Sequence, residues 1–248
     1  MKVLVVSDVH ANIAALNTIL EKEADYDILC CAGDTDYGIY PAEVIERFRN
    51  LKNTHLVYGN HDLHVINTYE SKEWKNVEDG KYKWVHYNCE QLNDQGIRWL
   101  KQLPETAYFE ADGWKYGIAH QYDSGYGTIE SRYAFDKYWA EHYGTDNTGN
   151  RRLIFGHTHR QCIHILGDGM EWLNPGSASY RRPDDPDKTA HYATITDGEI
   201  RLKQIPYDRK PQFEKAKEFI STDKMMRTEI QDFMFFFGDA KTSREPLE

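Results

Sequence analysis

Five apolar stretches of this chain each end on a side chain that can bind a metal, and this pattern constrains the fold more than any other feature. A β-branched apolar run followed at once by Asp, Asn or His is typical of a buried strand that opens into a loop. Open α/β sheets bind their ligands at the carboxyl ends of strands, so we expect the five loops to converge on one edge. The stretches end at Asp8 and His10, at Asp34, at Asn60 and His61, at His120, and at His157 and His159.

The first part of the chain alternates strands with helices. Strands are expected at residues 2–7, 27–32 and 54–58, with helices at residues 12–23 and after Pro41. A strand, helix, strand order predicts a parallel sheet with right-handed crossovers. The order therefore places the ends of the first three strands on the same side.

Short strands dominate after a helical region at residues 63–103. The dipeptides Asp112-Gly113 and Asp197-Gly198 each separate two of these strands and are typical of tight hairpins. We expect an α/β fold of mixed α+β character, a four-layer α-β-β-α sandwich of two packed sheets flanked by helices. A terminal helix at about residues 210–237 is expected to cover one flank. The later strands are expected at residues 107–110, 115–119, 153–155, 162–166, 172–173, 192–196 and 199–205.

Length and charge narrow the functional class. The 248 residues fit a single domain at 1–248, and 40 acidic against 30 basic residues give a net charge of -10. This balance argues against a nucleic-acid polymer as partner. The chain enters a strand at once and has no apolar segment long enough for a signal peptide or a membrane span, so we expect a cytoplasmic protein with no membrane partner. Its four cysteines have no spacing typical of disulfides or zinc sites.

The donor types indicate a metal site with two ions. Asp8 and His10 lie two residues apart, so both can reach one cation from an extended segment, and the same holds for His157 and His159. The two oxygens of Asp34 can bind two different ions about 3.5 to 4 Å apart. Mixed imidazole and carboxylate donors favour transition metals such as manganese, iron or zinc over calcium.

Taken in order, these motifs resemble the calcineurin-like metallophosphoesterase superfamily. The match consists of Asp8-x-His10, Gly33-Asp34, Gly59-Asn60-His61-Asp62, His120 and Gly156-His157-Thr158-His159. Asn174-Pro175-Gly176-Ser177 further resembles the small bacterial and archaeal phosphodiesterase branch, which includes diadenosine tetraphosphatase-like members. The fold that the resemblance implies, two sheets between helices, agrees with the fold expected from the strand pattern.

The resemblance implies a role for each motif position. His61 is expected to be the catalytic histidine beside the phosphorus, and Asp34 is expected to bridge two divalent or trivalent ions. This sequence has Ala11 and Gln121 where the family commonly has Gly, which can change the substrate pocket without removing a donor. The remaining implied ligands are Asp8, His10 and His159 for the first ion, and Asn60, His120 and His157 for the second.

The resemblance also implies a reaction. Two cations make a bridging hydroxide available near neutral pH, and we expect it to hydrolyse a phosphodiester or phosphoanhydride. A small, nucleotide-like substrate such as a dinucleoside polyphosphate is preferred, and a phosphoprotein or phosphomonoester phosphatase is the alternative. A non-catalytic scaffold of the same fold is a third possibility, because fold alone does not fix function. Against it, all seven ligand positions and His61 are filled.

A Tyr- and Trp-rich segment at residues 122–151 interrupts the strand pattern next to the candidate donors. Two interpretations stay open: a lid whose rings stack on a base or sugar, or a surface helix at residues 131–142 that uses its aromatic residues for packing. Three further residues are candidate substrate contacts. They are Asn12, which can instead cap the following helix, Tyr122, and Arg181, which can instead pair with nearby acidic residues.

Overall fold

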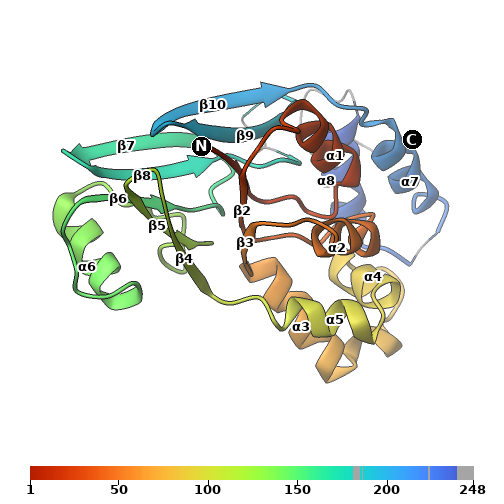
Figure 1. The fold of residues 1–248 in the computed structure, drawn as a ribbon. Helices are drawn as coiled ribbons and strands as arrows, with labels where there is room; N and C mark the ends of the chain where they lie inside the picture. The colour runs from red at the N-terminus through yellow and green to blue at the C-terminus, as the bar shows by residue number, and fades with distance from the viewer. Residues whose placement is uncertain (181–184, 186, 223, 239–248) are drawn as a thin grey trace.

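The computed structural model describes residues 1–180, 185, 187–222 and 224–238 and contains two five-stranded sheets (Figure 1). The first sheet has the order β10-β9-β1-β2-β3, and the second has the order β4-β5-β6-β8-β7. The expected architecture of two packed sheets flanked by helices is confirmed.

The first sheet combines parallel and antiparallel pairs. β1 (Lys2–Val6), β2 (Ile28–Ala32) and β3 (Thr54–Val57) are parallel, as the alternation with helices predicted. β9 (Ala190–Thr196) pairs antiparallel with β1, and β10 (Glu199–Ile205) pairs antiparallel with β9. The carboxyl ends of β1, β2 and β3 therefore lie on the same edge.

The second sheet has a parallel centre. β5 (Trp114–Ala119), β6 (Asn150–Ile154) and β8 (Met170–Pro175) are parallel to one another. β4 (Thr106–Ala111) and β7 (Gln161–Gly167) pair antiparallel at the two edges. The ends of β5 and β6 thus also share one edge.

Both predicted hairpins are present. Asp112 and Gly113 have φ values of 48° and 75°, and Asp197 and Gly198 have 49° and 84°. Two successive positive φ angles match a type I′ turn, whose twist suits the strands on either side. The two turns fix the registers of β4 with β5 and of β9 with β10.

Alternate faces of the sheets form separate cores. Val3, Val5 and Cys30 of the first sheet pack against Tyr116 and Ile118 of the second. The opposite face of the first sheet packs on α1 (Ile13–Lys22) and α2 (Pro41–Arg49), and the outer face of the second packs on α6 (Arg132–His142). Figure 1 shows α6 at one end of the molecule and α7 at the other.

The chain between β3 and β4 consists of several short helices. They are α3 (Asn60–Ser71), the 3₁₀ helix η1 (Glu73–Asn76), α4 (Trp84–Gln91) and α5 (Asp94–Leu100). α3 begins directly after β3, which brings its first turn to the edge where the strands end. No helix within the described ranges has both the length and the apolar character that a bilayer span requires.

The single terminal helix predicted for residues 210–237 is wrong, because the structure has two helices there. They are α7 (Lys210–Glu218) and α8 (Arg227–Phe237). Between them, the hydroxyls of Ser221 and Thr222 donate hydrogen bonds to the carbonyls of Glu218 and Phe219. Such local bonds compete with helix continuation. The break allows α8 to turn back, and its Phe233 stacks on Trp84 of α4 at 4.1 Å.

Candidate metal centre

The predicted strand-end loops meet in the structure. The backbone amide of Asp8 donates to the carbonyl of Gly33 at 3.0 Å, and that of His10 donates to Asp34 at 3.0 Å. From the second sheet, the amide of Gly156 donates to the carbonyl of His120 at 2.9 Å. These bonds join the ends of β1 to β2 and of β5 to β6. The N–H of His157 donates to Oδ2 of Asp8 at 3.1 Å and so joins the loops of the two sheets, which confirms the convergence expected from the sequence.

Most of the donors at this edge have an unusual backbone conformation. The φ angles are 51° at Asp8, 46° at His10, 54° at Asp34, 67° at His157 and 59° at His159. A non-glycine residue in this region is uncommon and costs about 1 to 3 kcal/mol, and such residues cluster at functional sites. The fold holds these side chains in tight loops at the expense of stability.

Two glycines allow the loops to approach closely. A Cβ atom on Gly156 would lie 1.9 Å from Oγ of Ser7, and one on Gly59 would lie 2.1 Å from Oδ1 of Asp34. Neither position has room for a side chain. The Gly-His and Gly-Asn pairs in the sequence therefore have a steric reason.

The first group of donors consists of Asp8, His10 and His159, all buried. Nε2 of His159 lies 3.2 Å from Oδ1 of Asp8 and 3.3 Å from Nε2 of His10. The ligand atoms of the three residues are close enough together to hold one metal ion. Two imidazole nitrogens facing each other need a proton or a cation between them, because two lone pairs repel.

The second group is built around Asn60. Its Oδ1 lies 2.9 Å from Nε2 of His120 and 2.9 Å from Nδ1 of His157. His120 is buried, whereas Asn60 is exposed and His157 is partly exposed. The second group therefore faces solvent more than the first does.

Asp34 lies between the two groups. Its Oδ1 accepts the backbone N–H of His61 at 2.9 Å. Its Oδ2 lies 3.2 Å from Nε2 of His120 and 3.9 Å from Nε2 of His10, and no described residue forms a hydrogen bond to it. An orphaned buried carboxylate oxygen that faces both groups fits a ligand shared between two cations.

The charges of the site also fit cations. Burial would raise the pKa of Asp8, but the charge and hydrogen bond of His159 outweigh it and lower that pKa to about 2. Burial would lower the pKa of His120, but Asp34 outweighs it and raises that pKa to about 10. Within the described ranges no Lys or Arg pairs with Asp8 or Asp34, so these two buried carboxylates face only histidines, which leaves their charge for a cation to balance.

His61 lies beside the first group, at the start of α3. Its ring is 5.2 Å from the ring of His10 in an edge-on arrangement and 4.3 Å from the ring of Tyr37. Its Nδ1 is buried without a hydrogen-bond partner in the described part of the chain. The ring is thus held by packing rather than by hydrogen bonds from that nitrogen.

Comparison with known families decides the assignment. The profile of the calcineurin-like phosphoesterase superfamily domain matches residues 1–198. The chain belongs to this superfamily. It is a metal-dependent phosphoester hydrolase, and its clustered histidines and aspartates can hold the metal that the family requires.

Relatives of this phosphoesterase span nearly its whole length. An uncharacterized protein of Methanocaldococcus jannaschii is 29% identical over 235 residues, which cover 86% of this chain and 90% of that protein. A hypothetical protein of Pyrococcus horikoshii is similar in structure with a TM-score of 0.73 at 17% identity, covering 97% and 99% of the two chains. A metallophosphoesterase of Sphaerobacter thermophilus has a TM-score of 0.64 at 21% identity, covering 88% and 93%. The two structural likenesses show the common fold.

Sequence reasoning missed the structural role of Asp62 in this phosphoesterase. Its buried carboxylate accepts the N–H groups of Thr35, Asp36 and Gly59 and the hydroxyl of Thr35, at 2.8 to 3.1 Å. These bonds tie the loop after β2 to the first turn of α3. The signal was present, because Asp62 occupies the third helical position, where an acidic side chain can reach back to the helix start.

Tyr180 was also missed. Its ring stacks on His10 at 4.6 Å and contacts His159 edge-on at 5.0 Å. On its other side, Phe236 of α8 stacks on it at 4.6 Å. α8 lies beyond the matched family domain, and no spacing in the sequence connects Phe236 with His10. This contact depends on the tertiary structure alone.

Of the three candidate substrate contacts, Asn12 and Tyr122 lie in the described part of the chain. Asn12 caps α1: its Oδ1 accepts the N–H of Ala15, and its Nδ2 donates to Tyr207. Tyr122 packs beside Tyr138, with 5.8 Å between ring centres. Arg181 lies outside the described residues.

The aromatic segment at residues 122–151 contains a packed helix and, before it, a loop with an exposed aromatic side chain. Phe135, Tyr138 and Trp139 of α6 are buried against the second sheet, so the packing helix is confirmed, with Ser131 as its cap. The loop before it differs. Tyr126 is 64% exposed, and its ring stacks on His157 at 5.0 Å. An exposed aromatic face therefore adjoins the second donor group.

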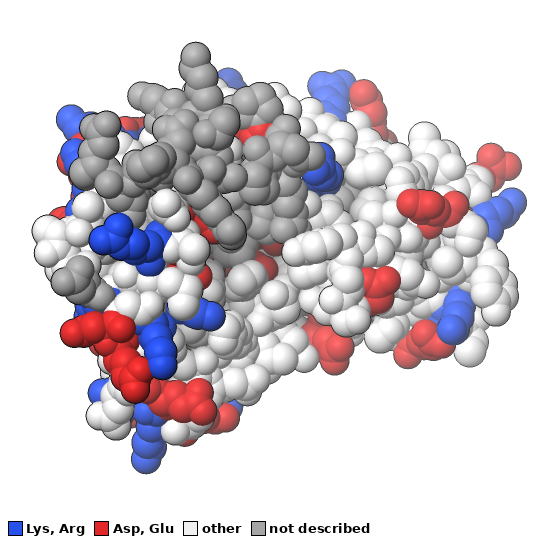
Figure 2. Space-filling view, turned by 180° about the vertical axis from the view of Figure 1, so that it is seen from behind, with Lys and Arg blue, Asp and Glu red and all other residues white. Residues whose placement is uncertain are grey.

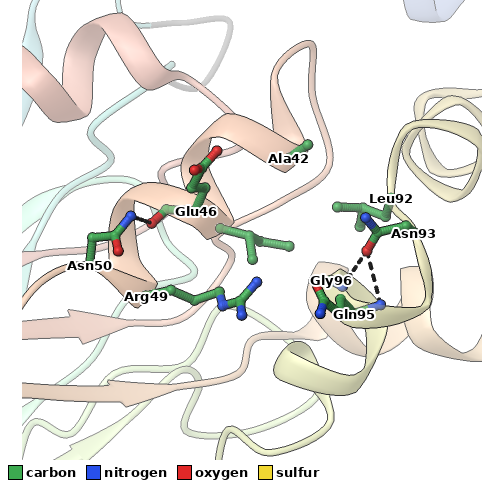
Figure 3. A pocket seen from close by; sticks show the side chains of 9 residues that line it. Ala42, Glu46, Arg49, Asn50, Leu92, Asn93, Gln95 and Gly96 are labelled. Carbon is green, nitrogen blue, oxygen red and sulfur yellow. Dashed lines mark hydrogen bonds between the residues drawn. The ribbon is translucent and has the colours of Figure 1, made fainter.

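On the face seen in Figure 2, Lys and Arg side chains lie among Asp and Glu side chains, and the described residues form no broad basic area there. A cavity of about 440 Å³ lies between α2 and α5, where Glu46, Arg49 and Gln95 line it (Figure 3). None of the candidate metal ligands is among the residues that line this cavity.

Proposed function

We propose that this phosphoesterase hydrolyses a phosphodiester or phosphoanhydride of a small, nucleotide-like substrate, such as a dinucleoside polyphosphate. The observation that carries the proposal is the meeting of two donor groups at Oδ2 of Asp34, a buried oxygen with no hydrogen bond from any described residue. Two donor groups with one shared carboxylate match a pair of transition-metal ions, manganese, iron or zinc.

We assign the ligands by these contacts and by the family motifs. Asp34 would belong to both ions. Asp8 lies close to His159 and also close to Asp34 and His120, so its carboxylate is near both donor groups. The other proposed ligands are Asp8, His10 and His159 for the first ion, and Asn60, His120 and His157 for the second.

When bound, the ions would neutralise phosphate oxygens and make an attacking water more acidic. The chain's own residues position the reacting groups. The αL loops and the Asp62 hydrogen bonds hold the donors in place before substrate arrives, which avoids reorganisation during the reaction. The exposed side of Asn60 and His157 would admit the phosphate.

We assign His61 to the leaving group. Its ring lies against His10 and is fixed by Tyr37, within reach of a phosphate held between the two groups. A histidine there can give a proton to the departing oxygen, a role typically worth 10² to 10⁴ in rate.

Two observations favour a nucleotide over a phosphoprotein. The exposed ring of Tyr126 beside His157 is suited to stacking on a base, which typically contributes about 1 to 3 kcal/mol per base. A solved structure described as a candidate diadenosine tetraphosphatase also shares the fold, with a TM-score of 0.55 at 16% identity.

A substrate panel with added manganese tests the proposal. It compares a nitrophenyl monoester, a nitrophenyl diester, cyclic nucleotides, a dinucleoside tetraphosphate and a phosphopeptide, with metal content measured on the same sample. We expect about two ions per chain and the highest kcat/KM for the dinucleoside tetraphosphate or a nucleotide diester. A preference for the phosphopeptide or the monoester would overturn the substrate assignment. Protein without metal and without activity after manganese addition would instead support a scaffold.

A further inference from the structure

The two histidines of the first donor group lack a hydrogen bond that metal-binding histidines usually form. A histidine that binds a metal through one ring nitrogen normally donates from the other to a carbonyl or a carboxylate, which fixes the orientation of the ring. In the second group His120 follows this rule, because its Nδ1 lies 2.7 Å from the carbonyl oxygen of Ala32. In the first group, Nδ1 of His10 and Nδ1 of His159 are buried, and neither has a hydrogen-bond partner among the described residues. Packing must therefore fix these two rings.

Tyr180 contacts both of these rings. Its ring is stacked on that of His10, with 4.6 Å between ring centres and 26° between planes, and it meets the ring of His159 edge-on at 5.0 Å. An imidazole that binds a cation is poorer in electrons, so the negative face of a phenol ring attracts it more strongly. The contact is therefore expected to stabilise the metal-bound state more than the metal-free state.

The helix α8 holds Tyr180 from the side opposite His10. Phe236 of α8 stacks on Tyr180 with 4.6 Å between ring centres and 24° between planes. α8 follows residues 1–198, the part of the chain that the family profile matches. An element outside the family domain thus reaches a ligand of the first ion through two stacked rings.

Two basic side chains fix the end of α8. Lys188 donates to the carbonyl of Phe235, and Nη1 of Arg209 donates to the carbonyl of Phe237 at 2.8 Å. Such bonds stabilise a helix end, because they satisfy its last carbonyls and oppose the negative end of its dipole. Phe236 lies between the two anchored residues, so its ring is held in place for the stack.

We propose that Tyr180 is a positioning residue for the first metal ion, and that α8 sets the affinity of this ion by holding Tyr180 against His10. The inference rests on the assignment of ligands in the proposed function. The second group has a support of its own in the bond of His120 to Ala32. The effect of α8 is therefore confined to the first ion.

Manganese binding tests the inference one ion at a time. His157→Ala removes a ligand of the second ion and keeps the first group, whereas His159→Ala does the reverse. In the His157→Ala background, Tyr180→Leu should raise the dissociation constant for manganese by about 10- to 100-fold, as for other groups that orient ligands. In the His159→Ala background the same change should leave the dissociation constant as it was. Tyr180→Phe should keep the affinity in both backgrounds, because it keeps the ring. Equilibrium dialysis with metal analysis measures all of these constants without turnover.

Phe236→Leu and Phe233→Leu form a matched pair on α8, and they test the inference even if Tyr180→Leu does not fold. Phe233 stacks on Trp84 of α4, with 4.1 Å between ring centres. Both changes remove one stacked ring, and urea unfolding measures the stability that each loses. Only Phe236→Leu should weaken the first ion, by about two- to tenfold, which corresponds to the contribution of one aromatic pair.

The outcomes separate this inference from the proposed function. Unchanged manganese affinity in both Tyr180→Leu and Phe236→Leu, or equal losses in the two single-ion backgrounds, overturns the inference and leaves the proposed function in place. Selective weakening of the first ion in a protein that hydrolyses no phosphoester contradicts the proposed function alone. A wild-type protein that binds no manganese contradicts both.

Discussion

Replacing Asp62 with alanine tests whether the loop after β2 and the start of α3 act as one unit. The Asp62 carboxylate is buried and accepts four hydrogen bonds, three from backbone N–H groups and one from the hydroxyl of Thr35. This network joins two segments. Asp34 lies in the loop after β2, and Asn60 and His61 are the first two residues of α3. Removing the acceptor should loosen the very segments that carry three proposed functional residues.

The magnitude follows from the contacts. Each hydrogen bond to a charged group contributes about 1.5 to 3 kcal/mol, so four bonds set an upper limit of roughly 6 to 12 kcal/mol. Burial and the nearby charge of Asp34 raise the pKa of Asp62, so the ionised carboxylate itself is disfavoured and part of that energy is offset. We expect the free energy of unfolding to fall by about 3 to 5 kcal/mol. Manganese affinity should fall by about 10- to 100-fold, as for other groups that orient ligands.

Urea unfolding and a manganese titration measure the two effects. Glu43→Ala is the matched control, because Glu43 occupies the corresponding third position of α2 and is exposed. It should lose only the helix-dipole contribution of about 0.3 to 1 kcal/mol. If Asp62→Ala does not fold, Asp62→Asn still tests the reasoning, since it keeps one oxygen acceptor and should lose about 1 to 3 kcal/mol. An Asp62 variant as stable as the control, with unchanged manganese affinity, would refute it.

Three further outcomes are expected. His61→Ala should still bind manganese but should hydrolyse an unactivated ester about 10² to 10⁴ times more slowly. The control His64→Ala, one helical turn further along α3, should have wild-type activity. Full turnover by His61→Ala would contradict the assignment of His61 to the leaving group. Glu23 is buried, yet hydrogen bonds from Lys2, Lys203 and Tyr192 outweigh burial and lower its pKa to about 2 from its ordinary 4.5. Its contribution is therefore present above pH 4.5 and lost as the pH falls toward 2, so the stability advantage of wild type over Glu23→Gln should shrink by about 3 kcal/mol across that window, and a constant difference would exclude this cause. Gly156→Ala should lower the free energy of unfolding by about 1 to 3 kcal/mol and weaken manganese binding, because its Cβ would lie 1.9 Å from Oγ of Ser7. Gly125→Ala is the control, since the nearest atom to its Cβ would be 3.4 Å away. Equal stability of the two alanine variants would count against the steric argument.

Regular patterns made much of the fold predictable. Apolar β-branched runs marked the strands, Pro41 marked the first turn of α2, and the Asp-Gly pairs marked both hairpins. Each of these signals is local, because it depends on side-chain alternation or on the backbone angles of two adjacent residues. The terminal helix was mispredicted for the same reason. Apolar residues lie on both sides of Ser221 and Thr222, which favoured one long helix, but the hydroxyls of this polar pair bond to the preceding carbonyls and the helix ends there.

The candidate donors were predictable for a related reason. Parallel strands end on one edge, so residues that directly follow such strands must come together, however far apart they lie in sequence. This argument places Asp8, Asp34 and His120 near one another from the sequence alone, and the structure confirms their proximity. The argument gives no distances, and it could not show which oxygen of Asp34 stays unpaired.

By itself, the sequence determined the two-sheet architecture and the edge at which the donors meet, because strand order and side-chain alternation are encoded locally. Only the tertiary structure decided what surrounds that edge. The stacking of Phe236 on Tyr180 and of Tyr180 on His10 joins a terminal helix to the first donor group. A cavity beside His120 likewise takes its walls from elements separated along the chain. Such contacts follow from how helices pack on sheets, and packing depends on the shapes of all the side chains together.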